Sequence, residues 1–322
     1  MFCRMQCLLI VLLVMQEIIK PISKSILASE LHQELKVRNT HYGENEIYIF
    51  KDQQAPQVLL EIGRLRELTF RAAGGGTGKS VDLDDFDTGS NAYRQLLVWN
   101  PKEQEIVGAY RFMVCSEAQT DQAGPLLSTR HLFHYSPEFI QNILPKTIEL
   151  GRSFIQPLFQ VASGSRKGLF SLDNLWDGLG ALCVLYPHHT YFFGKVTMYT
   201  DYPKTARDLL LNFMAYYFPD PNSWVLPKKP LADYIPDPLI QQQWHTLSYK
   251  DGHAKLSKDL RAMGTHIPPL INAYMSLSSS MRMFGTALNP EFGGVEETGI
   301  LVHTPDIYDS KKQRHIQSFT LQ

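Results

Sequence analysis

Charged side chains inside otherwise apolar segments are the first candidates for chemistry in this 322-residue chain. Glu149 and Arg152 lie three residues apart in the apolar segment 147–155, and Arg111 lies in a second apolar segment, 106–114. A charge in such a segment needs a partner if it is buried. The three residues are therefore candidates either for a functional site or for a structural network of ion pairs.

Four further residues accompany this set, namely Arg66 with Phe70 and Asp84 with Asp87. Arg66 and Phe70 are four residues apart in a predicted helix, and the two aspartates are three apart in an acidic loop. The two aspartates are candidate partners of the arginines. A purely structural network of ion pairs is the alternative interpretation.

The glycine-rich segment 73–80 (AGGGTGKS) nearly matches a phosphate-binding loop. That motif needs glycine where Ala73 stands, and it must leave a strand and enter a helix. Here a predicted helix precedes the segment, and the acidic run 82–85 that follows would repel a nucleotide. We therefore predict no nucleotide site, and expect a flexible loop able to close over a site.

The candidate residues are placed by alternating strands and helices. Apolar spacing predicts a strand over 46–50, a helix from Pro56, a hairpin of 95–99 with 106–114, and a strand over 147–155. A helix from Ser171, a strand over 191–199 and a helix over 203–217 follow. A proline-rich stretch, 219–245, then leads into a mostly helical end. In a regular strand Glu149 and Arg152 would lie on opposite faces, unless a bulge at Gly151 changes this.

A small and basic turn precedes the helix at Ser171. Small residues and backbone N–H groups before a helix favour an anion such as a phosphate, and basic side chains add to this. An exposed basic turn without a ligand is the alternative. The candidate residues for binding such an anion are Ser163, Gly164, Ser165, Arg166, Lys167 and Gly168.

Composition excludes several classes of protein. With 31 Lys and Arg against 32 Asp and Glu, the chain has no broad basic field for nucleic acid. Four cysteines without a CxxC pair indicate a reducing compartment, and no histidine or cysteine spacing predicts a metal site. The apolar run 7–15 resembles part of a secretory signal, but we expect a start at Met15 and a cytoplasmic protein, with peripheral contact at the inner membrane face as an option.

In order and spacing, Arg66-x3-Phe70, Asp84-x2-Asp87, Arg111 and Glu149-x2-Arg152 resemble the signature of acyl-homoserine-lactone synthases. With 108–112 (GAYRF) and 149–153 (ELGRS), the chain is more similar to the haemolysin-named GNAT acyltransferases that make lyso-ornithine and glycine lipids. The similarity continues through 267–274 and 284–292. The glycine-rich segment resembles that of the family branch found in Bacteroides-like bacteria. The members of this branch look like glycine-lipid enzymes.

The resemblance implies an α/β (α+β) fold with a mixed, splayed GNAT sheet flanked by helices and a mostly helical C-terminal extension. It implies an N-terminal segment 1–45, an acyltransferase core 46–218 and an extension 219–322 that completes the site. The donor's pantetheine arm would lie between strands 147–155 and 191–199.

It further implies that a long, 3-hydroxylated acyl group moves from the phosphopantetheine thioester of acyl carrier protein, or from acyl-CoA, to an amine, with no bound cofactor. Glycine is the expected acceptor, and a lyso-aminolipid such as lyso-ornithine lipid is the alternative. Glu149 would deprotonate or orient the ammonium group of the acceptor, and Arg111 and Arg152 would bind its carboxylate or organise the acidic loop. The residues at the acceptor site or in the loop beside it would be Arg66, Phe70, Asp84 and Asp87. The turn 163–168 would bind the phosphate of the donor's pantetheine arm or the acidic surface of the carrier protein. The alternative functions from another class are those of a membrane-damaging protein or of a non-catalytic binding protein.

Overall fold

The computed structural model describes residues 15–160 and 168–319, and its centre is a mixed eight-stranded sheet. Within those residues the strand order is β1-β2-β3-β4-β8-β9-β12-β11, and every neighbouring pair is antiparallel except β8 with β9. The strands are β1 (Lys36–Asn39), β2 (Glu46–Phe50), β3 (Arg94–Asn100), β4 (Glu105–Val114), β8 (Thr147–Ile155), β9 (Tyr191–Met198), β11 (Arg282–Asn289) and β12 (Val295–His303).

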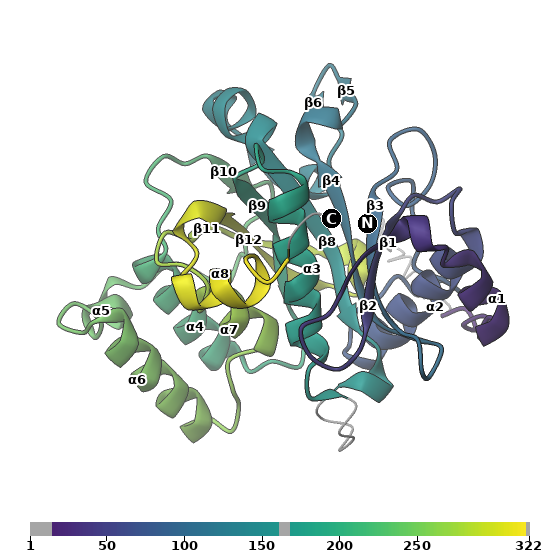
Figure 1. Cartoon of the computed structure of the whole chain (residues 1–322). Helices are drawn as coiled ribbons and strands as arrows, with labels where there is room; N and C mark the ends of the chain where they lie inside the picture. Colours follow the sequence, from purple (N-terminus) through teal and green to yellow (C-terminus); the bar gives the residue numbers. More distant parts are fainter. Residues whose placement is uncertain (1–14, 161–167, 320–322) are drawn as a thin grey trace, which may run out of the picture.

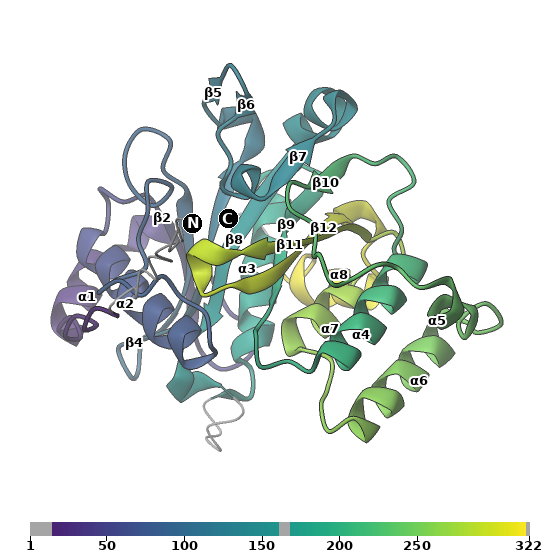
Figure 2. The ribbon, with the colours of Figure 1, turned by 180° about the vertical axis from the view of Figure 1, so that it is seen from behind.

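Helices cover both faces of the sheet (Figures 1 and 2). Leu97 and Ala109 pack in a core with α1 and α2, whereas their chain neighbours Leu96 and Tyr110 pack in a core with α3, α4, α6 and α7. This alternation follows the two-residue period of a strand. The helices are α1 (Lys24–Glu30), α2 (Pro56–Ala72), α3 (Ser171–Leu185), α4 (Lys204–Tyr217), α5 (Pro238–Gln242), α6 (Tyr249–Ala262), α7 (Pro269–Met275) and α8 (Asp309–His315).

The predicted α/β class, the mixed sheet flanked by helices and the helical C-terminal part are confirmed. Three strands of the eight-stranded sheet were not predicted, namely β1, β11 and β12. Since β12 pairs with β9 and β1 pairs with β2, segments 1–45 and 219–322 both contribute strands to the sheet of the 46–218 core. The expected start at Met15 concerns residues 1–14, which lie outside the described residues.

Strands β8 and β9 pair over three residues and then diverge. Thr147, Ile148 and Glu149 pair in parallel with 191–193, and no pairing continues beyond Glu149. Gly194 marks the point of divergence, because a Cβ atom there would lie 2.7 Å from the carbonyl oxygen of Leu150. The sheet is therefore splayed between these two strands.

A β-bulge in β8 adjoins this splay. Arg111 pairs with Gly151 and Ala109 with Phe154, so Tyr110 alone faces the two residues between them, Arg152 and Ser153. Arg152 has a φ of +49°, in the left-handed region that side chains rarely adopt. The bulge lies one residue beyond the expected position at Gly151, and it turns Arg152 toward the same acidic loop that Arg111 contacts.

Candidate active site

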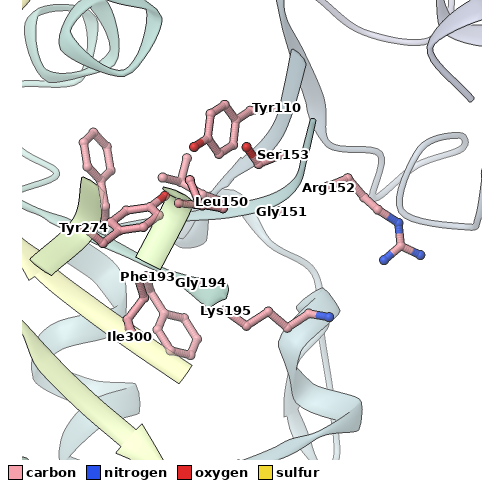
Figure 3. A pocket seen from close by; sticks show the side chains of 12 residues that line it. Tyr110, Leu150, Gly151, Arg152, Ser153, Phe193, Gly194, Lys195, Tyr274 and Ile300 are labelled. Carbon is pink, nitrogen blue, oxygen red and sulfur yellow. The ribbon is translucent and has the colours of Figure 1, made fainter. Parts of the chain in front are cut away.

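A narrow cavity lies between the diverging strands β8 and β9 (Figure 3). Its volume of about 30 Å³ is close to that of a single water molecule. Apolar side chains from both sides of the splay form much of its wall, and an acyl chain can enter only if these side chains move apart. They are Leu150, Phe192, Phe193, Leu270 and Ile300.

Two cations, Arg152 and Lys195, line the same cavity. Figure 3 shows their side chains extending in a common direction, away from the hydroxyl groups of Tyr110 and Tyr274. The guanidinium of Arg152 lies over the ring of Phe292, 4.4 Å from its centroid. One end of the cavity is therefore lined by two cationic side chains, each of which is paired with a carboxylate.

Lys195 forms an ion pair with Glu297 across β9 and β12, and both side chains are largely buried. Burial lowers the pKa of Lys195, although the negative charge of Glu297 opposes this. Lys195 lines the cavity and Glu297 does not, so the pair connects the cavity wall to a buried carboxylate on β12. Sequence analysis missed both residues, although Lys195 is a lone charge in an apolar strand, the signal that identified Glu149.

Five of the predicted residues form one buried chain of ion pairs. Arg66 donates to Asp87 at 2.8 Å, Asp87 lies 2.8 Å from Arg111, and Arg111 lies 2.6 Å from Asp84. Asp84 in turn lies 3.6 Å from Arg152. Burial alone would raise the pKa of Asp87, but the charges of Arg66 and Arg111 outweigh it and hold that pKa far below its ordinary value. This chain fixes the acidic loop and Arg152 beside the cleft.

Phe70, predicted together with Arg66, packs on the same side of the sheet. Its ring contacts Phe154 of β8 edge-on at 6.4 Å and Phe292 at 5.2 Å, measured between centroids. Phe292 is also the ring beneath Arg152. Phe70 thus supports the surface on which the guanidinium rests and does not line the cavity itself.

Glu149 is fully buried and is not among the residues that line the cavity. Its carboxylate accepts hydrogen bonds from the hydroxyl of Tyr93, from the backbone N–H of Ser128 at 3.2 Å and from the backbone N–H of Thr129 at 2.9 Å. The hydroxyls of Ser128, at 3.3 Å, and of Thr129 also donate to it. Glu149 therefore ties β8 to the short helix Ser128–His131 through both oxygens.

The glycine-rich segment surrounds an anion, but the anion is the protein's own Glu67. The buried Glu67 carboxylate accepts from the backbone N–H of Thr77 at 3.0 Å and of Gly78 at 2.8 Å, and Arg71 pairs with it at 2.7 Å. These are the amides that a phosphate-binding loop would offer to a nucleotide. The segment also packs on the turn between β11 and β12, where a Cβ atom at Gly293 would lie 2.9 Å from Gly75 Cα.

Most of the predicted donor-binding turn, comprising Ser163, Gly164, Ser165, Arg166 and Lys167, lies outside the described residues. Gly168 is described and packs tightly, since a Cβ atom there would lie 2.7 Å from the carbonyl oxygen of Phe159. Helix α3 begins three residues later, and no side chain caps its first turn.

Comparisons with known proteins are consistent with this geometry. The chain is 51% identical over 306 residues to the glycine N(alpha)-acyltransferase of Bacteroides thetaiotaomicron, covering 95% of this chain and 91% of that protein. It is 49% identical over 309 residues to the glycine N(alpha)-acyltransferase of Phocaeicola vulgatus, covering 96% and 95%. The profile of the acetyltransferase (GNAT) domain matches residues 65–166. The chain belongs to the GNAT family of N-acyltransferases.

The resemblance predicted from the sequence is confirmed, and this GNAT protein is an acyltransferase. The solved structure of FeeM, an N-acyl amino acid synthase from uncultured soil microbes, aligns over 82% of this chain and 94% of that one, at 9% identity and a TM-score of 0.40. In the acyltransferase's described residues, no helix is both long and apolar enough to cross a membrane.

Proposed function

We propose that this acyltransferase joins a long acyl group to the amine of glycine, with the reaction at the mouth of the cleft between β8 and β9. The observation that carries the proposal is the arrangement of the cavity, which has apolar walls and the cations Arg152 and Lys195 at one end. An acyl chain matches the walls, and an amino-acid carboxylate matches the cations. The relatives that are about half identical carry the name glycine N(alpha)-acyltransferase.

The acceptor is a zwitterion, and the charges at the cleft complement both of its ends. Arg152 and Lys195 bind the carboxylate of glycine, while Glu297, released from part of its contact with Lys195, receives the ammonium group or its proton. The amine must be neutral before it attacks, so a carboxylate beside it favours the reaction. This places the proton acceptor at Glu297 and not at Glu149, whose oxygens already accept five hydrogen bonds.

The transfer itself forms a C–N bond and breaks the C–S bond of the thioester. The neutral amine attacks the carbonyl carbon, the carbonyl oxygen takes up negative charge, and the thiolate leaves and is protonated. The bulge at Arg152 and Ser153 removes a residue from the ladder with β4, so its backbone is available to donate to that oxygen. Arg111 and Asp84 then act as positioning residues, because they hold Arg152 and the acidic loop in place.

For the donor, we propose the phosphopantetheine thioester of acyl carrier protein, with acyl-CoA as the alternative. Both carry a pantetheine arm and a phosphate, which suit the splayed strands and the start of α3. The turn 163–168 precedes that helix and supplies the basic side chains. The N-acylglycine product is an amphiphile and would be passed on to lipid synthesis at the membrane surface.

The test supplies purified protein with palmitoyl carrier protein or palmitoyl-CoA and isotopically labelled glycine, and detects products by mass spectrometry. We expect labelled N-palmitoylglycine, formed faster from the carrier-protein donor. Release of free palmitate without labelled product would contradict the proposed function. Parallel reactions supply ornithine or a lyso-lipid in place of glycine, and product from one of these with none from glycine would contradict the proposed acceptor.

A further inference from the structure

The segment from Ser128 to Phe133 lies over the sheet at the place where β8 and β9 diverge. A Cβ atom on Gly151 of β8 would lie 3.8 Å from the Ser128 hydroxyl oxygen. A Cβ atom on Gly299 of β12 would lie 3.3 Å from the ring of Phe133. Since β9 lies between β8 and β12, the segment spans β9. Lys195 of β9 pairs with Gly299, so its side chain points to the face of the sheet that this segment covers.

His131 is the last residue of the short helix in this segment. Its Nδ1 donates to the carbonyl oxygen of Ser128, which can only accept, so Nδ1 carries the hydrogen and Nε2 carries the lone pair. Within residues 15–160 and 168–319, no group forms a hydrogen bond with Nε2. His131 is exposed, while its helix is anchored to β8 through the Glu149 carboxylate. The imidazole therefore offers a proton acceptor in contact with solvent and at a fixed position.

Charged groups from two strands and a turn lie close enough to His131 for their charges to act on its ring. They are Lys195 of β9, Glu297 of β12 and Glu291 of the turn between β11 and β12. Loss of water around the ring and the charge of Lys195 lower the pKa of His131 from its ordinary value of 6.5, although its backbone hydrogen bond and the two glutamates oppose this. The imidazole is therefore neutral at pH 7 and can accept a proton.

The proposed reaction must dispose of protons from the acceptor. Glycine enters as an ammonium and leaves as a neutral amide, so the nitrogen loses two protons. One of them protonates the leaving thiolate, and the other must reach solvent. Glu297, the proposed first acceptor, is 2% exposed and paired with Lys195, so it has little contact with water. It lies two residues from Gly299 on the same strand, so its side chain points to the face that His131 covers.

We propose that His131 is the proton exit of the acceptor site, where Nε2 accepts the proton that Glu297 takes from the ammonium and the imidazolium then releases it to water. The inference rests on the proposed function and adds a residue to it. Imidazole suits this step better than a second carboxylate, because its pKa lies near the pH of the reaction and it can both accept and release a proton. In this role His131 binds neither substrate, so its loss slows turnover and leaves binding intact.

The direct test is His131→Asn, since the asparagine amide nitrogen takes the place of Nδ1 and keeps the hydrogen bond to Ser128 while the proton acceptor is lost. With palmitoyl carrier protein and glycine at pH 7, we expect kcat to fall about 10- to 100-fold and the KM for glycine to stay within about threefold. Added imidazole should restore part of the lost rate, because the position is open to solvent. The parent kcat should also fall as the pH drops through the pKa of His131, below 6.5, and the variant should lack this fall.

His134→Asn is the matched control. His134 is also exposed and lies three residues farther along the chain. Its strand neighbours Phe133 and Tyr135 pack in the core, so its own side chain points away from the sheet. The change at His134 should leave kcat, its pH profile and its response to imidazole as in the parent.

A parental kcat and pH profile in His131→Asn would overturn the proposal and leave the proposed function intact. A loss of kcat that imidazole does not restore, or a higher KM at unchanged kcat, would assign His131 to structure or to acceptor binding and would overturn it as well. His131→Gln replaces the first variant in the same comparison if thermal unfolding shows that His131→Asn does not fold. If the parent acylates another amine and not glycine, a kcat loss restored by imidazole with that amine would support the proton exit although the proposed acceptor is wrong. No acylated amine from the parent would refute both.

Discussion

The Nε atom of Arg152 lies 2.9 Å from the carboxylate of Asp82, which is fully buried. This pair anchors the guanidinium by one edge, while the β-bulge holds the backbone of Arg152 in the left-handed conformation. Its planar fork is thereby fixed at the rim of the cleft, where it can bind a carboxylate through two parallel hydrogen bonds. The acceptor site thus depends on a side chain and on the irregular strand that carries it.

Arg152→Lys tests this role, since lysine keeps the charge opposite Asp82 but loses the fork. We expect the KM for glycine to rise about tenfold or more, with kcat within a few-fold of the parent. Steady-state kinetics at saturating donor would measure both. Arg282→Lys is the control, because Arg282 pairs with Asp220 at 3.2 Å outside the cavity lining and should leave both constants unchanged. An unaltered KM in Arg152→Lys would remove Arg152 from the acceptor site.

Glu149→Gln distinguishes a positioning role from that of a base. Glutamine has an NH2 group in place of one carboxylate oxygen. This hydrogen-bond donor would face the N–H or O–H donors of Tyr93, Ser128 or Thr129, which need an acceptor. We expect the free energy of unfolding to fall by about 2–3 kcal/mol, with kcat of the folded protein within a few-fold of the parent. Urea denaturation and kinetics at low temperature would show both. A loss of kcat of about 100-fold at unchanged stability would instead assign Glu149 as the base.

The ion-pair chain predicts an acid-sensitive contribution to stability from Asp87. Its pKa is held below the ordinary value of 3.8, so its stabilising charge is fully present above that value and is lost as the pH falls through the lower folded-state pKa. We expect Asp87→Asn to lower the free energy of unfolding by about 3–5 kcal/mol at pH 7, because Arg66 and Arg111 lose a buried partner. The difference should narrow below about pH 4. A constant difference from pH 7 to pH 2.5 in chemical denaturation would contradict this.

The backbone of the glycine-rich segment surrounds the Glu67 carboxylate, and this packing predicts that two glycines of the segment differ in how well they tolerate substitution by alanine. Gly76 has a φ of +91°, and an added Cβ would lie 3.2 Å from the backbone nitrogen of Arg71, whereas Gly78 has a φ of +74° with open space around it. We expect Gly76→Ala to cost about 2–3 kcal/mol and Gly78→Ala about 1 kcal/mol, since only the first adds a clash to the left-handed strain. Thermal and urea unfolding of the two variants would compare them. Equal losses would contradict the packing described for this loop.

Sequence patterns predicted the elements that carry the site with good accuracy. The helix at Pro56, the hairpin, the strand 147–155 and the helix at Ser171 all form where apolar spacing and proline placed them. Their local signals are strong because each has one buried face. Strands β11 and β12 were missed. They form a hairpin with each other, and it joins the sheet only through the pairing of β12 with β9, which is distant in the chain.

The site itself was only partly predictable. Charged residues in apolar segments correctly indicated burial at Arg111 and Glu149, whereas Arg66 and Asp87, in a helix and an acidic loop, carried no such signal and are buried as well. Burial also does not tell which of these residues faces a cavity. Whether Arg152 faces the cavity depends on the bulge, and arginine is not a residue type that predicts a left-handed backbone conformation. Lys195 and Tyr110 reach the cleft only because β8 and β9 diverge, a feature of strand pairing and not of local sequence.

The measurement that tests the central claim most directly is a competition among amino acids. Parent protein and Arg152→Lys would each receive acyl carrier protein loaded with a long acyl chain and an equimolar mixture of glycine, alanine, serine and ornithine, with products quantified by mass spectrometry. The account predicts N-acylglycine as the dominant parent product, and a fall in its yield in the variant at limiting glycine. Dominance of another acceptor, or a glycine yield that Arg152→Lys does not change, would contradict it.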